Sequence, residues 1–292
     1  MLSFHQGFLD YTTRVYHDSY PAVSTSNHSD RAILITGATG GIGRGIATSF
    51  ARAGACAIAI MGRNRSLLEQ VEKDILQEAH DASIPRPNVL KLCTDTTDSD
   101  SVRNAALAVE SSFGKLDILV NNAGRMESMD SLQDSDPTDW WRTFEVNIKG
   151  TYLVTHSFPG LLLRGHQKTI INISSIAALM QSENMSAYQI TKSATLKFSD
   201  CIMGEYGKGG IISFCVHPGF VSTNLIGVIP KEETSMFIDS PDLCGDTLAW
   251  LTQERREWLA GRLISVNWDM TEFVSRREEI VQKDKLKMQV VL

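Results

Sequence analysis

The sequence is short of the residues that build disulfide frameworks and metal centres. It has five cysteines in 292 residues, an odd number with no C-x-x-C pair, and its seven histidines show no metal-ligand spacing. This composition excludes a disulfide scaffold and gives no sign of a metal site. Most of the cysteines lie in apolar stretches such as GACAIAI. We therefore expect reduced thiols in the protein core and a reducing compartment.

Long apolar runs and dense basic clusters are also missing. No segment approaches the roughly 18 apolar residues of a membrane span, and the first 30 residues lack the basic and apolar regions of a secretory signal. The formal net charge is −6, whereas a protein that tracks phosphates needs a basic face. These absences predict a cytoplasmic protein with no membrane and no nucleic acid among its partners.

The sequence does contain a regular alternation of strand-like and helix-like segments. Short apolar runs rich in β-branched residues alternate with helical periodicity. The expected strands are RAILIT, CAIAIM, VLKLCT, LDILVN, TIINIS, IISFCV and GRLISV. Such strands, separated by helices, indicate a doubly wound α/β sandwich around a parallel sheet of about seven strands, a single-domain Rossmann fold.

Three segments stand out from this alternation. Residues 1–30 are polar and aperiodic, and we expect an N-terminal extension before a catalytic domain at 31–268 and a C-terminal extension at 269–292. A long helical region is expected over roughly 137–163, and another helix over about 186–207. Residues 219–238 form the longest stretch without a clear element, which is typical of a lid or binding loop.

The first chemical motif is the glycine-rich turn in LITGATGGIGRGIA, between the first expected strand and helix. Gly37, Gly41 and Gly43 permit a tight turn, and Thr39 and Ile42 belong to the same turn. The free N–H groups of the following helix suit a pyrophosphate. A glycine cluster alone is weak evidence, and a structural turn is the alternative, but its place at the first strand–helix junction favours dinucleotide binding.

The end of the second strand predicts which dinucleotide binds. In this fold an acid at that point holds a ribose 2′-OH, whereas an arginine accommodates a 2′-phosphate. The chain reads IAIMGRNRS, with Arg63 and Asn64 and no carboxylate. We therefore expect NADP(H) to be preferred, with NAD(H) possible; an ordinary exposed loop arginine is the alternative.

The glycine turn and several motifs after it occur in the order and spacing of one family. Over about residues 31–268 the chain resembles the short-chain dehydrogenases/reductases. TGATGGIG is similar to the cofactor turn of that family, NNAG at 121–124 to its fourth-strand motif, and HPGFVSTNL at 217–225 to its nicotinamide segment. The resemblance implies further cofactor contacts at Asp95, Thr96, Asn122, Ala123, Gly124, Pro218, Gly219, Val221 and Thr223, and at Tyr188 and Lys192. The two terminal stretches resemble extensions in a fungal branch of the family.

The same resemblance implies a catalytic set of Asn147, Ser175, Tyr188 and Lys192. A tyrosine has a pKa of about 10, and an ammonium one helical turn away stabilises its phenolate. Tyr188 is therefore the expected general acid/base, with Lys192 as its electrostatic partner. Ser175, with Ser174 as its rival, would orient the substrate oxygen. For Asn147 the resemblance implies a kinked helix and a proton-relay water.

The expected reaction is hydride transfer between a nicotinamide and a carbonyl or secondary alcohol, with ketone reduction of a hydrophobic molecule favoured. Met126, Met180, Met185, Met236 and Phe237, beside Ser175, suggest an apolar pocket for a polyketide-like substrate of secondary metabolism, although they could equally be core or interface residues. The family usually forms homodimers or homotetramers. The alternatives are an epimerase, isomerase or dehydratase without net redox change, and a non-catalytic nucleotide sensor.

Overall fold

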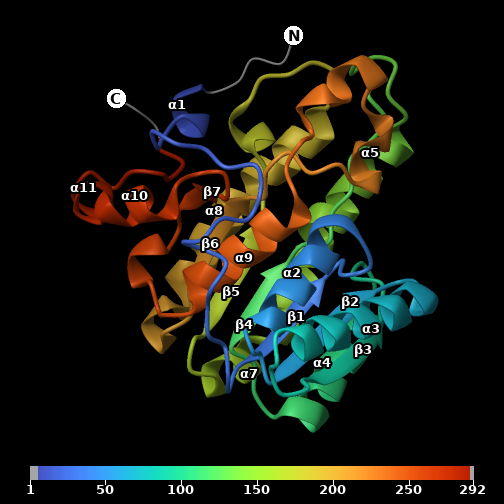
Figure 1. Ribbon diagram of the computed structural model, residues 1–292. Helices are drawn as coiled ribbons and strands as arrows, with labels where there is room; N and C mark the ends of the chain where they lie inside the picture. The colour runs from blue at the N-terminus through green and yellow to red at the C-terminus, as the bar shows by residue number, and fades with distance from the viewer. Residues whose placement is uncertain (1–5, 290–292) are drawn as a thin grey trace.

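A seven-stranded parallel sheet forms the centre of the protein, shown as a computed structural model in Figure 1. The structure describes residues 6–289. The strand order is β3-β2-β1-β4-β5-β6-β7. The strands are β1 (Ala32–Thr36), β2 (Ala57–Gly62), β3 (Asn88–Cys93), β4 (Ile118–Asn121), β5 (Thr169–Ile173), β6 (Ile212–His217) and β7 (Leu263–Ser265). All seven lie where the apolar runs predicted them, and the doubly wound fold is confirmed.

Helices cover both faces of the sheet because its strands are apolar on both sides. One face packs against α2 (Gly41–Arg52), α3 (Arg65–Asp81) and α9 (Pro241–Thr252). The other packs against α4 (Ser99–Phe113), α6 (Thr151–Ser157), α7 (Pro159–Arg164) and α8 (Ser186–Tyr206). Within β1, Ile33 and Ile35 belong to the first core and Leu34 to the second, as the alternation of a strand requires.

The region 137–163, which the periodicity predicted as a long helical region, consists of several helical segments. It comprises α5 (Pro137–Phe144), a π-helical segment η1 (Glu145–Gly150), and then α6 and α7. Pro159 begins α7, which separates it from α6 because proline cannot donate an N–H to a preceding turn. Asn147 lies inside the π-helical segment, so the helix is distorted at the residue for which a kink was expected.

The remaining elements are short. Two 3₁₀ segments, η4 (Asn224–Val228) and η5 (Lys231–Met236), lie in the expected loop, and three more are η2 (Ile176–Leu179), η3 (Gly207–Gly209) and η6 (Glu257–Leu259). The N-terminal part contains α1 (Gln6–Leu9), and the C-terminal part α10 (Met270–Ser275) and α11 (Arg277–Gln282). These two parts lie side by side in Figure 1. Val15 pairs with Trp268 in an antiparallel bridge between them.

The expectation of core cysteines is wrong for three of the five. Cys56, Cys93 and Cys201 are exposed, whereas Cys215 and Cys244 are buried. Cys56 precedes β2, and Cys93 ends β3, a strand at the edge of the sheet with one side open. Apolar neighbours along the chain therefore did not decide burial. Within residues 6–289, no helix is long and apolar enough to span a bilayer.

Candidate active site

A cavity of about 660 Å³ opens at the carboxyl ends of the strands. Segments that follow β1 to β6 line it, and it lies over the β1–β4 boundary, where the strand order reverses. Open parallel sheets bind ligands at this kind of position, because the loops on either side of the reversal diverge. The residues in the cavity therefore decide what the protein binds.

The glycine turn forms the wall of the cavity at the start of α2. Gly37 and Gly41 have φ values of 64° and 50°, a conformation that favours glycine. A Cβ atom on Gly43 would lie 2.3 Å from the Gly37 carbonyl oxygen. Gly40, the N-cap of α2, has no capping side chain. The helix therefore presents uncapped N–H groups to the cavity, and this turn fits the pyrophosphate of a dinucleotide.

Two charged residues line the cavity just after the ends of β2 and β3. Arg63 is exposed and lines it. Asp95 also lines it, and although burial acts to raise its pKa, hydrogen bonds from Thr97 and the charges of Arg142 and Arg63 hold that pKa below its ordinary value. Asn64, expected at the cofactor, is not among the residues lining the cavity. Its side chain accepts a hydrogen bond of 3.2 Å from the Leu67 N–H and caps α3.

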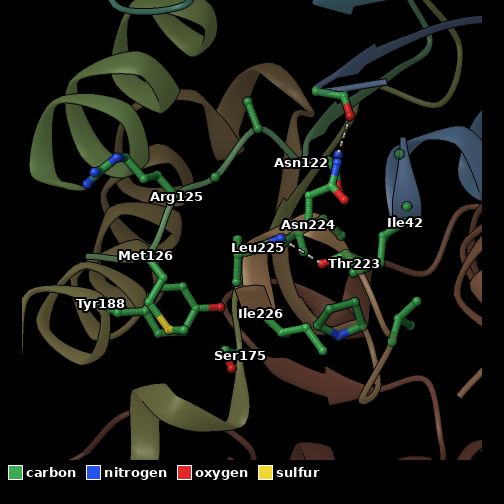
Figure 2. A pocket seen from close by; sticks show the side chains of 18 of the residues that line it. Ile42, Asn122, Arg125, Met126, Ser175, Tyr188, Thr223, Asn224, Leu225 and Ile226 are labelled. Carbon is green, nitrogen blue, oxygen red and sulfur yellow. Dashed lines mark hydrogen bonds between the residues drawn. The ribbon is translucent and has the colours of Figure 1, made fainter. Parts of the chain in front are cut away.

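Asn122 ties β4 to the glycine turn. Its side-chain amide donates to the carbonyl oxygens of Thr36, at 2.9 Å, and Gly37, at 3.1 Å. Figure 2 shows Asn122 from close by, with one hydrogen bond of its side-chain nitrogen as a dashed line. The backbone N–H groups of Asn122 and Ala123 donate in turn to the Thr36 hydroxyl. This amide thus fixes the shape of the turn while the residue lines the cavity.

Tyr188 and Lys192 come from the first two turns of α8, and Ser175 from the end of β5. In Figure 2 the Tyr188 hydroxyl points away from α8 toward the region of Ser175 and Ile226. Burial raises the pKa of Tyr188 to about 12, with Ser175 acting against this and the Glu127 charge adding to it. Burial lowers the pKa of Lys192 to about 8. The Lys192 Nζ lies 5.5 Å from the Tyr188 ring centroid and donates to the Ile173 carbonyl at 2.8 Å.

The two adjacent serines have different partners. The Ser174 hydroxyl is buried and donates to the Lys192 carbonyl at 2.9 Å, which holds α8 against the end of β5. The Ser175 Oγ accepts from the Ala177 N–H at 3.1 Å. A hydroxyl that accepts can still donate its own proton, so Ser175 is the better placed of the two to bind a substrate oxygen.

Asn147 lies behind the cavity and does not line it. Its side chain accepts from the Arg125 N–H and donates to the Arg125 carbonyl, both at 2.8 Å, and donates to the Thr191 hydroxyl at 3.0 Å. The amide therefore clamps the segment after β4 to the helix that carries Tyr188 and Lys192.

The sequence model of the short chain dehydrogenase family matches residues 31–234. The chain belongs to the short-chain dehydrogenase/reductase family. The short chain dehydrogenase mpl6 of Monascus purpureus is 46% identical over 282 residues, which cover 96% of each chain. The short chain dehydrogenase andI of Emericella variicolor is 41% identical, again over 96% of each chain. These relatives place the protein in a fungal branch.

The chain is also similar to solved structures of short chain dehydrogenases. A short chain dehydrogenase from Escherichia coli CFT073 complexed with NADPH is 26% identical, with a TM-score of 0.73, covering 84% of this chain and 99% of that one. A similar protein from Shigella flexneri 2a, complexed with NADP, has 25% identity over 82% of this chain and 97% of that one, with a TM-score of 0.72. The protein is thus an oxidoreductase of this family, and a nicotinamide cofactor fits its cavity.

Part of the cavity lining is apolar. The residues that the sequence predicted to contact a substrate all line the cavity, namely Met126, Met180, Met185, Met236, Phe237 and Ser175. Met129, Phe220, Leu225, Ile226 and Ile229 line the cavity as well. The sequence had not singled them out one by one, but substrate contacts were expected from RMESMD after Gly124 and from residues 225–238, which contain all of them except Phe220. In the described part of the chain, no group of three or more His, Cys, Asp or Glu side chains is placed to hold a metal.

Glu127 is a further residue that the sequence did not single out. It is buried, and its Oε1 accepts from the Tyr188 backbone N–H at 3.1 Å. Met185, the N-cap of α8, offers no side-chain cap, so Glu127 caps this helix from another part of the chain. A carboxylate there is favoured by the positive end of the helix dipole. No local pattern predicts a cap 61 residues away.

Proposed function

We propose that this dehydrogenase reduces the ketone group of a hydrophobic, polyketide-like small molecule with NADPH. The observation that carries the proposal is the composition of one cavity. The same cavity is lined by the glycine turn and Arg63, by Ser175, Tyr188 and Lys192, and by several methionines. Polarizable, unbranched methionines adapt to bulky apolar ligands, and the few polar groups that converge on one point fix the orientation of the bound molecule.

The proposed chemistry needs one proton at the substrate oxygen. When bound, the nicotinamide supplies the hydride for ketone reduction or accepts it in alcohol oxidation. Ser175 donates a hydrogen bond to the substrate oxygen, and Tyr188 transfers its proton to the same atom. Lys192, with a pKa of about 8, is mostly charged at neutral pH. It lies one helical turn from Tyr188, where an ammonium stabilises the phenolate. Asn147 acts through the clamp it forms between Arg125 and Thr191.

Arg63→Ala tests the preference for NADP(H). We expect the Kd for NADPH to rise about 10- to 100-fold, because hydrogen bonds to a charged group contribute about 1.5–3 kcal/mol. NADH, which lacks the 2′-phosphate, should bind the variant as it binds the wild type. The measurement is nicotinamide fluorescence titration. Arg65→Ala is the matched control, since Arg65 is an exposed neighbour outside the cavity. Wild-type protein that binds NADH as tightly as NADPH would contradict the preference.

Glu127→Gln tests how the buried carboxylate affects the general acid/base. The amide keeps an acceptor for the Tyr188 N–H but removes the charge that raises the Tyr188 pKa. A lower pKa makes the phenolate form available at lower pH. We therefore expect the pH profile of alcohol oxidation to move toward lower pH, as measured by initial rates across pH. Glu183→Gln, an exposed acid before α8, should leave the profile in place. A profile that moves upward would refute the assignment.

A further inference from the structure

A buried carboxylate joins the two ends of the loop that covers the cavity. The Asp239 side chain is 1% exposed. Its Oδ2 accepts from the Phe220 N–H at 2.5 Å and from the Asn267 side-chain amide at 2.8 Å. The Asp239 N–H donates back to the Phe220 carbonyl at 3.0 Å. The loop from Phe220 to Asp239 is therefore closed at its base by reciprocal hydrogen bonds around a single side chain.

The other carboxylate oxygen of Asp239 binds the N-terminal extension. The His17 Nδ1 lies 2.5 Å from Oδ1, and because a carboxylate only accepts, the imidazole donates. The next residue continues the contact: the Ser240 N–H donates to the His17 carbonyl at 2.9 Å, and the Ser240 hydroxyl donates to the Asp18 carboxylate at 2.6 Å. The extension thus contacts both the last residue of the loop and the N-cap of α9.

The extension is itself anchored to the sheet. The Tyr16 N–H donates to the Asn267 carbonyl at 2.8 Å, and the Asn267 side chain donates to the Tyr16 carbonyl at 2.9 Å. Val15 pairs with Trp268 just beyond β7. Asn267 therefore holds Tyr16 and Asp239 together, so that His17 reaches the loop from a fixed backbone and not from a free end.

The loop closed in this way forms much of the cavity wall. Val221, Thr223, Leu225, Ile226, Ile229, Met236 and Phe237 line the cavity between its two ends. Thr223 also packs against the glycine turn, where a Cβ on Gly41 would lie 2.6 Å from its Cγ2. A displacement at the base of the loop would therefore move groups at both the cofactor end and the apolar end.

We propose that residues 15–18 are a tether for this loop, and that His17 is a positioning residue of the active site that acts through Asp239. A buried carboxylate needs a donor for each oxygen, and Oδ2 has its donors from the body of the protein. Oδ1 takes its donor from the extension. The extension in this way supports the wall of the cavity, although none of residues 15–18 lines it.

His17→Ala tests the tether by hydrogen exchange. The expected result is exchange about tenfold faster at the amides of 220–238, because a lost hydrogen bond to a charged group raises the population of locally open states by about that factor. Amides of β1, β4 and β5 should keep their wild-type rates, which shows that the variant is folded. His17→Gln supplies an amide donor and should restore most of the protection.

Thr13→Ala is the matched control, because Thr13 lies in the same extension but bonds Glu272 on α10. It should leave exchange in the loop unchanged. Wild-type exchange in the loop of His17→Ala overturns the tether. So does equal acceleration in Thr13→Ala, which would show a general loosening of the extension.

The consequence for ligand binding rests on the proposed function and is measured separately with NADPH as the probe. We expect the Kd for NADPH to rise several-fold in His17→Ala and to return toward wild type in His17→Gln. If loop exchange is faster in His17→Ala but the wild-type protein binds no NADPH, the tether is supported and the proposed function is rejected. Faster exchange with an unchanged Kd would reject the positioning role of His17.

Discussion

Tyr188→Phe is expected to lower turnover about a thousandfold, because general acid–base catalysis contributes about 10²–10⁴ to a rate. The substitution removes only the hydroxyl that points into the cavity (Figure 2). The ring, and its position over Lys192, remain. The Kd for NADPH should therefore stay within a few-fold of the wild-type value. The measurements are steady-state NADPH oxidation with a panel of hydrophobic ketones, and fluorescence titration of the cofactor.

Tyr206→Phe is the matched control, since Tyr206 ends the same helix and is not among the residues that line the cavity. It should turn over normally. Retained turnover in Tyr188→Phe would contradict the acid/base assignment. A wild-type enzyme that converts substrate with no net change in NADPH, and loses this conversion in Tyr188→Phe, would support an epimerase, isomerase or dehydratase. Full function of Tyr188→Phe in cells would favour a non-catalytic nucleotide sensor.

Gly43→Ala is expected to weaken NADPH binding by about 5- to 150-fold, because overpacking forces backbone shifts that cost about 1–3 kcal/mol. The new methyl group would lie 2.3 Å from the Gly37 carbonyl oxygen and 2.6 Å from the Asn122 side-chain nitrogen. Neither neighbour can withdraw without moving the turn, because Asn122 also holds Thr36. The measurements are the Kd for NADPH and the Tm of the free protein, which should fall by several degrees.

Gly204→Ala provides the comparison for this substitution. Gly204 lies in the last turn of α8, and a Cβ there meets nothing within 4 Å. Alanine is favoured over glycine in a helix by about 0.5–1 kcal/mol, so the Tm should rise slightly and NADPH binding should not change. Wild-type Kd and Tm in Gly43→Ala would show that the turn is not packed as described.

The sequence predicted those parts of the fold whose cause is local. Each strand is a short apolar run next to glycines or polar residues. A strand buried on both faces reads as a continuous apolar run, whichever helices cover it. The glycine turn is predictable for the same reason, because Gly37 and Gly41 take backbone conformations that favour glycine. The glycine turn could thus be located between the first strand and the first helix from the sequence alone.

Features decided by distant partners could not be predicted in this way. The π-helical segment around Asn147 coincides with a clamp on Arg125, which is 22 residues away along the chain. A kink at Asn147 was expected only from the family resemblance, and the clamp on Arg125 was not expected. Asn64, next to Arg63, was predicted to contact the cofactor. In the structure its side chain caps α3 by accepting a hydrogen bond from the Leu67 N–H, three residues further along. Glu127 and Asp239 carry no motif, since the atoms they bind belong to other parts of the fold.

The pairing of residues 15–17 with the segment after β7 also has a consequence for synthesis. Tyr16 and Asn267 are 251 residues apart along the chain, so residues 15–17 cannot dock until Asn267 has been synthesised. Contacts of such long sequence separation form late, after the loops between them have closed. The sheet from β3 to β6 can assemble on the nascent chain, but the wall of the cavity can be completed only after Asn267 has emerged. Ribosome-stalled chains that end before this residue should therefore carry a folded glycine turn and an open binding cavity.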